Sequence, residues 1–442
     1  MSHIGQRFRA WLNPNSLLRN QKGDYTIASD CLRGAAPGGI ACVGIESDAQ
    51  KPSQKGLNMN QQVIVRTADS PADFKAFFDF PWQVYKDDPN WVPPLVSMRK
   101  ELLSKEKNAA WEYMEGDYFV AWRGDKPVGT IAAFINHRHN EHWKTRVGWF
   151  GAFECYDDQE AATALLNTAD EWVRSRGYPV IMGPQTFTTH EEVGLLIDGF
   201  QQPLLLMAYH RPYYQKLIET AGYAKAIDMN SFYYDWDQVA RDNFEGRLAK
   251  IVEWRMKKGG ITVRPSNPKD RRGDFEIIKA LYNDAWDANW GFVPLTPREL
   301  DAMIESLGLV FNPDWTYFAY IDEKPVGLVM SVGDFNQVLK YASPRPGVPE
   351  PFTLLRAAWH WKVRPKINRV RVPLLGVIPE HRNKGVDLVM IYHLVLALKN
   401  TGIKQADAGW ILESNQDMAG MLRGFGMETY RTYRMYEKKF QL

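Results

Sequence analysis

The amino-acid sequence predicts a mixed α/β protein made of two matching halves, each a twisted mixed sheet flanked by helices. Strand-like runs alternate with amphipathic helical stretches, which excludes a helical bundle and a sandwich of sheets. The same order of elements also occurs twice with the same spacing, because 63 residues separate Arg66 from Gly129 and 63 separate Arg264 from Gly327. A length of 442 residues with ordinary globular composition supports two domains.

The first segment, residues 1–58, differs from the rest of the chain in composition. It contains three aromatic residues, ten glycines and prolines, and no sustained hydrophobic periodicity. We expect a disordered leader, with Met59 as an alternative initiator. The two domains are then expected at 59–245 and 246–442.

Both halves are expected to share one order of elements: a strand, a helix, a hairpin, a strand, a helix, a strand, a short helix and an aromatic-rich closing strand. The first half reads as strand 63–66, a helix from Ser70, hairpin strands 118–122 and 126–129, strand 149–154, helix 159–175 and strand 180–183. The second half reads as strand 261–264, helix 275–282, hairpin strands 317–321 and 324–327, strand 370–379, helix 384–399 and strand 406–412.

Composition excludes several classes of function. The 54 basic and 52 acidic residues leave a charge of +2, so the strongly basic face typical of nucleic-acid binding is not expected. Three scattered cysteines do not make a disulfide framework or a cysteine zinc site. No apolar run reaches the roughly 20 residues of a membrane span, and no secretory apolar core occurs near the start. We therefore expect a cytoplasmic protein without a metal.

The most informative motif runs from Leu374 to Asp387, where a buried strand meets an amphipathic helix through a short basic turn. Such a turn exposes backbone N–H groups, and the helix dipole adds about half a positive charge there. Arg382 and Lys384 reinforce that charge, and the turn contains one glycine, Gly385. The motif is therefore suited to binding a pyrophosphate.

The segment Arg382–Val386 resembles the acyl-CoA pyrophosphate loop of the GNAT acyltransferase family, although Asp387 replaces the family's small residue. The stretch from residue 60 to residue 440 also resembles long bacterial tandem-GNAT proteins, a group that includes the bacterial ceramide synthases. The phrases that carry this resemblance are 88–95, 194–200, 289–292, 410–413 and 433–438. The resemblance implies two tandem GNAT-like domains and an N-acyltransferase that uses acyl-CoA.

The resemblance also implies roles for single residues on the acyl-CoA side. In the family the strand before the loop splays from its parallel neighbour, and backbone groups there hold the pantetheine and polarise the thioester carbonyl. Val377 and Ile378 take this place here, and Asn415 matches the asparagine that opens the next helix. The pyrophosphate contacts are then expected from Arg382, Asn383, Lys384, Gly385 and Val386.

The proton donor of the family is harder to locate. The tyrosine that protonates the leaving thiolate in the family falls on Leu422, so this acid is missing or comes from elsewhere. Tyr433 is the candidate, with core packing as the alternative for an aromatic residue in a strand.

The corresponding loop of the first half, 154–160, has four carboxylates, no glycine and no basic residue. Those charges repel a pyrophosphate, so we expect this half to have lost CoA binding and to shape the acceptor site instead. Asp157 and Asp158 fit an N-cap and a first helical turn.

The first half carries an additional segment around residues 188–194, after strand 180–183. His190 and Glu191 in this segment are the candidates for the general base that deprotonates the attacking amine. The alternative is a capping box, Thr189 with Glu192, which begins a short helix.

The acceptor is expected to be a small-molecule or lipid amine, with Asn289, Trp290 and Asn336 as acceptor-side candidates. By the resemblance it is a sphingoid base. Two alternatives stay open: an N-acetyltransferase of a small molecule or peptide amine, and a non-catalytic acyl-CoA-binding protein. The acyl length and the oligomeric state stay open as well.

Three further signals receive structural interpretations. His137, His139 and His142 fit a solvated loop better than a zinc site, because no fourth ligand suggests itself. Cys155 fits an inert buried residue. The basic, aromatic stretch 359–366 fits a solvated helix end, with a peripheral contact to an anionic inner-membrane surface as the alternative.

Overall fold

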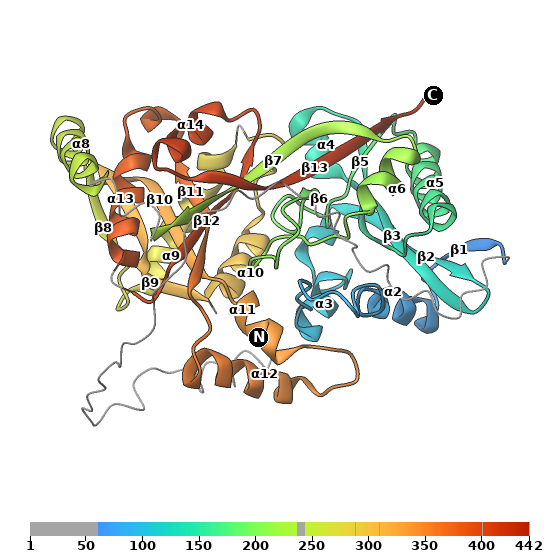
Figure 1. The fold of residues 1–442 in the computed structure, drawn as a ribbon. Helices are drawn as coiled ribbons and strands as arrows, with labels where there is room; N and C mark the ends of the chain where they lie inside the picture. The colour runs from blue at the N-terminus through green and yellow to red at the C-terminus, as the bar shows by residue number, and fades with distance from the viewer. Residues whose placement is uncertain (1–60, 237–243, 288, 309, 400, 442) are drawn as a thin grey trace, which may run out of the picture. The chain divides into compact units, whose positions relative to one another are not determined.

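The computed structural model describes residues 61–236, 244–287, 289–308, 310–399 and 401–441, so the predicted leader 1–58 lies outside the described residues. It confirms the mixed α/β class, because thirteen strands of the described part form one continuous mixed sheet with helices packed on it (Figure 1). No helix in these ranges is long and apolar enough to cross a membrane.

The first half follows the predicted order of elements closely. The helix expected at 159–175 is observed at those residues, and Asp158 accepts a hydrogen bond from Ala161 N as its N-cap. In order, the elements are β1 (Val63–Thr67), α2 (Pro71–Val84), α3 (Val96–Leu102), η2 (Ala109–Glu112), β2 (Met114–Arg123), β3 (Lys126–Asn136), α4 (His137–Trp143), β4 (Val147–Cys155), α5 (Gln159–Ser175), β5 (Val180–Gly183), β6 (Leu195–Asp198), α6 (Tyr214–Thr220) and β7 (Ala224–Asp235).

The second half repeats this order with additional helices after its hairpin. In order, the elements are α8 (Phe244–Gly259), β8 (Thr262–Pro265), α9 (Arg271–Trp286), α10 (Pro297–Gly308), β9 (Phe311–Ile321), β10 (Lys324–Gly333), α11 (Asn336–Ala342), α12 (Glu350–Ala358), the π-helical turn η4 (Trp359–Val363), β11 (Arg369–Val377), the short η5 (Pro379–His381), α13 (Val386–Lys399), β12 (Gln405–Leu412), α14 (Gln416–Gly424) and β13 (Glu428–Lys439).

The two halves exchange their closing strands. The sheet order is β1-β2-β3-β4-β5-β13-β7-β12-β11-β10-β9-β8, with β6 also paired to β13. The last strand of the first half, β7, therefore pairs with β12, while the last strand of the chain, β13, pairs with β5. The domain boundary at 245/246 stays a prediction. Each half of the sheet includes a strand that pairs with the other half, so the two halves are not separate in the sheet.

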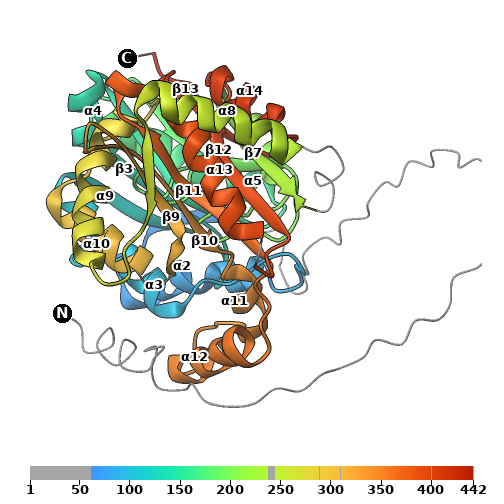
Figure 2. The same ribbon diagram turned by 90° about the vertical axis from the view of Figure 1, so that its left-hand side faces the viewer.

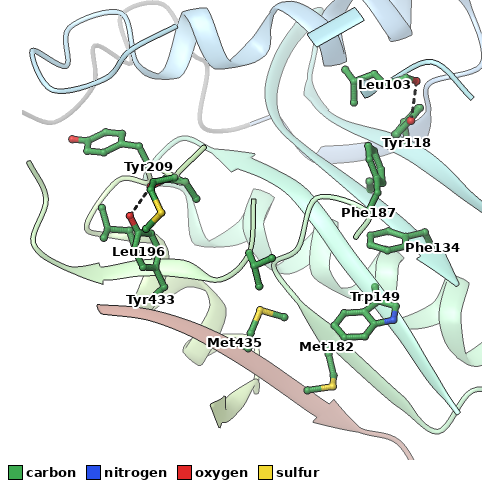
Figure 3. Packing of buried hydrophobic residues seen from close by; sticks show 14 of the residues in the cluster. Leu103, Tyr118, Phe134, Trp149, Met182, Phe187, Leu196, Tyr209, Tyr433 and Met435 are labelled. Atoms are coloured by element: carbon green, nitrogen blue, oxygen red, sulfur yellow. Dashed lines mark hydrogen bonds between the residues drawn. The ribbon is translucent and has the colours of Figure 1, made fainter. Parts of the chain in front are cut away.

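The exchange also unites the cores. Tyr433 and Met435 of β13 pack in one cluster with Tyr118, Phe134 and Trp149 of the first half (Figure 3). Burying each such side chain contributes about 1.5–3 kcal/mol. The closing strand of the chain is therefore part of the core of the first half.

Each half contains a pair of parallel strands that separate after three residues. β4 and β5 pair only from Val147 to Trp149, and β11 and β12 pair only from Arg369 to Arg371. Because the strands between the pairs are antiparallel to one another, β4 and β11 run in opposite directions. Their forks begin level with Lys225 and Tyr233 of β7, so both forks open toward the middle of that strand.

Candidate active site

The loop that joins β11 to α13 in the second half has the geometry of an anion-binding turn. Asn383 and Gly385 both adopt positive φ angles, 61° and 82°. None of the backbone N–H groups of residues 383–386 donates a hydrogen bond to another residue in the described ranges. Successive free N–H groups at the start of a helix form a site for phosphate oxygens.

The predicted basic side chains of this loop are exposed but partly engaged. Arg382 Nε donates to Val377 O (3.2 Å), and its Nη2 donates to Ala285 O (3.1 Å) of α9. Lys384 Nζ lies 3.1 Å from His381 Nδ1. Asp387 Oδ1 accepts from Leu388 N (2.9 Å), so this departure from the family pattern occupies one N–H group of the first helical turn.

A third basic side chain, which the sequence analysis missed, lies against this loop. Arg255 of α8 is so close that a Cβ at Gly385 would lie 3.3 Å from its Nε atom. That Nε is buried and has no hydrogen-bond partner within the described part of the chain. A buried donor without a partner is costly, so Arg255 is well placed to donate to a bound anion. In the sequence, the signal for this basic side chain is a short basic run, Arg255-Met256-Lys257-Lys258.

The fork next to the loop distinguishes the two residues predicted to face the thioester. Ile378 N donates to Val326 O (3.0 Å), and Ile378 O accepts from His381 N (3.0 Å). The oxyanion role predicted for Ile378 is therefore not supported. Because backbone directions alternate along a strand, the N–H of Val377 points away from β10 toward the open fork.

The additional segment of the first half forms a tight turn that reaches the second half. Thr186 N donates to Glu192 O (2.8 Å), and Glu191 N donates to Thr188 O (3.2 Å). Residues 188–192 are not helical, so the capping-box alternative is wrong.

His190 joins the two halves through both ring nitrogens. Its Nε2 lies 3.1 Å from Val293 O, and its Nδ1 lies 2.9 Å from Tyr282 OH on α9. A carbonyl only accepts, so Nε2 carries the proton and Nδ1 accepts from the tyrosine. Burial lowers the pKa of His190 and keeps the ring neutral. The base role predicted for His190 is not supported, because neither nitrogen is free to take a proton.

Glu191 and Glu192 lie in the turn 188–192, which contacts the second half through His190. Both side chains are open to solvent, yet the protein around them desolvates their carboxylates. Desolvation, with the nearby charges of Glu192 and Glu299, raises the pKa of Glu191 to about 7. A carboxylate with this pKa accepts a proton effectively near neutral pH.

A small polar cavity in the first half lies next to this turn and is lined in part by Glu192. It has a volume of about 50 Å³ and lies at the β4/β5 fork, lined by Arg99, Glu154, Gln185, Glu192 and His210 among others. Burial raises the pKa of Glu154 to about 7, and the Gln185 Oε1 atom is buried without a partner in the described residues. The cavity therefore presents acceptors to a hydrogen-bond donor such as an ammonium group. Sequence reasoning counted Glu154 only as a charge that repels phosphate.

The helix start of the first half is occupied by its own side chains. Asp158 caps α5, as predicted, and Arg123 Nη2 donates to Asp158 Oδ2 (2.8 Å) and to Glu160 Oε2 (2.9 Å). This arrangement leaves two carboxylates where a pyrophosphate would bind. The loss of CoA binding in this half stays a prediction that this geometry supports.

The remaining candidates have structural contacts in the fold. Tyr433 is buried, its hydroxyl donates to Ala208 O (3.2 Å), and burial raises its pKa to about 12 (Figure 3). The proton-donor role predicted for Tyr433 is therefore not supported. Asn415 caps α14 by accepting from Met418 N, and its predicted contact with CoA stays a prediction.

The acceptor-side candidates lie where the second half meets the first. Trp290 packs against the core cluster of the first half. Asn289 N donates to Trp286 O (2.8 Å) at the end of α9, and Asn336 Nδ2 donates to Pro203 O (3.1 Å). None of these contacts assigns an acceptor role, which stays a prediction.

The segment 204–206 of the first half is held at the β11/β12 fork. Arg371 Nη1 donates to Leu205 O and Leu206 O (both 2.9 Å), and its Nη2 donates to Gly409 O (3.2 Å). Leu204 is buried, whereas Leu206 remains exposed. This segment therefore places one apolar side chain beside the fork of the second half.

The structure also places the three histidines of 137–142 and Cys155. The three histidines lie on α4 rather than in a loop, and burial lowers the pKa of His139 to about 4. Within the described ranges no group of three or more His, Cys, Asp or Glu residues is placed to hold a metal ion. Cys155 is buried, as predicted, and burial raises the pKa of its thiol.

Comparison with known proteins adds the family. The model of the "Acetyltransferase (GNAT) family" matches residues 80–190. The chain is 34% identical to Protein YghO of Escherichia coli over 86% of this chain and 96% of that protein. It is 30% identical to the bacterial ceramide synthase of Caulobacter vibrioides over 86% of this chain and 98% of that protein. A tandem GNAT protein from the clavulanic acid biosynthesis pathway is similar over 86% of this chain and 98% of its own, with 11% identity and a TM-score of 0.47.

Proposed function

The chain belongs to the GNAT acyltransferase family, and on this premise we propose that it transfers an acyl group from acyl-CoA to the primary amine of a long-chain, sphingoid-type acceptor. The product is then a ceramide-type amide. The ceramide synthase of Caulobacter vibrioides, 30% identical over nearly its whole length, supports this choice of acceptor.

The observation that carries the acyl-CoA side is the loop 383–386 with its free N–H groups. Arg382, Lys384 and Arg255 surround this loop with positive charge, and the N–H of Val377 faces the adjoining fork. In the proposed arrangement the loop binds the pyrophosphate and the fork holds the pantetheine.

The proposed chemistry is direct attack of the amine on the thioester carbon. The C–N bond forms, the C–S bond breaks and the CoA thiolate leaves, while one amine proton passes to the carboxylate of Glu191. The cavity at Glu154 and Gln185 supplies acceptors for the ammonium form, which loses one proton to solvent before the neutral amine attacks. The enzyme works in the cytoplasm, at the surface of the inner membrane.

Two assays with purified protein test the proposal. Release of free CoA thiol is followed with palmitoyl-CoA and with acetyl-CoA, each with sphinganine or with a short primary amine, and the amide is identified by mass spectrometry. We expect turnover with palmitoyl-CoA and sphinganine. Turnover with acetyl-CoA and short amines alone would assign a small-molecule acetyltransferase, and no thiol release with any pair would contradict an enzymatic role.

A further inference from the structure

An apolar stripe on α12 and η4 is open to solvent. Phe352, Leu355, Trp359 and Val363 are 62, 56, 50 and 58% exposed. They follow one another at intervals of three or four residues, so they share one face of the helix. Isolated exposed apolar residues are ordinary, but four in one stripe mark an interaction surface.

The position of α12 favours contact with a broad surface. In both views α12 lies beyond the sheet and beyond the helices that cover it (Figures 1 and 2). The stripe is therefore free to contact a flat partner without obstruction by the sheet.

The charge around this stripe identifies its partner. Residues 336–366 contain six basic residues and one acidic residue, whereas the whole chain has a charge of only +2. Arg356, Lys362 and Arg364 are exposed beside the stripe. The one acidic residue, Glu350, accepts from Ser97 N (2.8 Å), which ties its carboxylate to α3.

We propose that α12 and η4 dock in the plane of an anionic lipid bilayer, with the apolar stripe inserted at the boundary between headgroups and acyl chains. An interfacial helix combines aromatic and aliphatic residues on one face with basic residues beside it, and this combination is present here. Anionic headgroups supply the charge that the exposed arginines and lysine complement.

The docking surface and the loop before it contact α2 and α3 of the first half. Trp82 Nε1 donates to Pro344 O (2.8 Å), and Ser97 N donates to Glu350 on α12. Two residues after Ser97, Arg99 lines the polar cavity at the β4/β5 fork. If the proposed function holds, docking brings the polar cavity at the β4/β5 fork close to the bilayer, from which a long-chain amine would enter.

Co-sedimentation of the full chain with lipid vesicles tests the proposal without any acyl-CoA or turnover, so its outcome is independent of the proposed reaction. Wild type is expected to bind vesicles that contain phosphatidylglycerol and to bind pure phosphatidylcholine weakly. Substituting Phe352→Ser, Leu355→Ser and Trp359→Ser together is expected to weaken binding by about a hundredfold. Lys362→Glu with Arg364→Glu is expected to weaken it by about thirtyfold.

A matched control changes the same number of exposed apolar residues elsewhere. Ile64→Ser, Ile251→Ser and Leu396→Ser are expected to leave vesicle binding unchanged, since these side chains lie on β1, α8 and α13. Equal binding of wild type to both vesicle types, or equal binding of the triple α12 variant and wild type, would overturn the proposal. A dimer that the α12 substitutions dissociate, with no vesicle binding, would assign the surface to a second copy instead.

Discussion

Replacing Glu191 by glutamine removes the carboxylate that we propose as the general base. Its pKa is raised to about 7 by desolvation and by the charges of Glu192 and Glu299. Only the deprotonated form accepts a proton, so the wild-type rate should rise as the pH increases through about 7, by roughly tenfold between pH 6 and pH 8. Glu191→Gln should lower the rate by at least about a hundredfold and abolish this rise.

The assay is the initial rate of CoA thiol release at saturating acyl-CoA across that range of pH. Glu192→Gln is the informative companion, because removal of its like charge should move the midpoint of the wild-type profile to lower pH while activity remains. Burial also raises the folded-state pKa of Glu191 above its unfolded value, so its ionisation opposes folding. The melting temperature of Glu191→Gln should therefore exceed that of wild type increasingly as the pH rises from about 5 to about 8. A Glu191→Gln enzyme with the wild-type rate and pH profile would refute the assignment.

Three further substitutions probe the loop and the helix starts. Gly385→Ala places a Cβ 3.1 Å from Arg255 Cδ at a φ of 82°, so the affinity for CoA measured by calorimetry should fall about tenfold; an unchanged affinity would show that the loop does not bind CoA. Arg255→Ala should also weaken CoA binding about tenfold, whereas Lys258→Ala on the same helix should not, and equal effects would show that charge alone matters. Asp158→Ala removes both the α5 cap and a partner of buried Arg123, so chemical denaturation should report a loss of about 3 kcal/mol; a loss below about 1 kcal/mol would contradict a structural role for this carboxylate.

The repeated pattern of the sequence was sufficient to predict the elements that repeat. Helix 159–175 is observed at the predicted residues, and the strand and helix around the loop 382–386 lie within two residues of their predicted bounds. Periodicity and helix-capping residues are local signals, so they predict an element without knowledge of its tertiary contacts.

The strand exchange was not predictable from those signals. β7 and β13 have similar apolar, aromatic patterns, and each fits beside β5 or β12 equally well on periodicity alone. Which pairing forms depends on contacts across the whole sheet, such as Tyr433 in the core of the first half.

The catalytic roles predicted for His190 and Tyr433 lack support for a related reason. His190 and Tyr433 were selected for their chemistry, but their polar atoms are engaged by Tyr282, Val293 and Ala208. Hydrogen-bond partners this far apart in sequence are set by the tertiary fold. Conversely, Arg255 has only a weak sequence signal, because it lies on α8, far in sequence from the loop 382–386 that it contacts.

The assignment of the CoA site to the loop 382–386 is the claim on which the other functional assignments depend most. Calorimetry of CoA binding to Arg382→Glu with Lys384→Glu tests it, with Lys100→Glu and Lys107→Glu on the other half as a control of equal charge change. We expect the dissociation constant to rise by about a hundredfold in the loop variant and to stay within about threefold of wild type in the control. An unchanged dissociation constant in the loop variant, or a crystal structure with CoA beside residues 155–160, would contradict it.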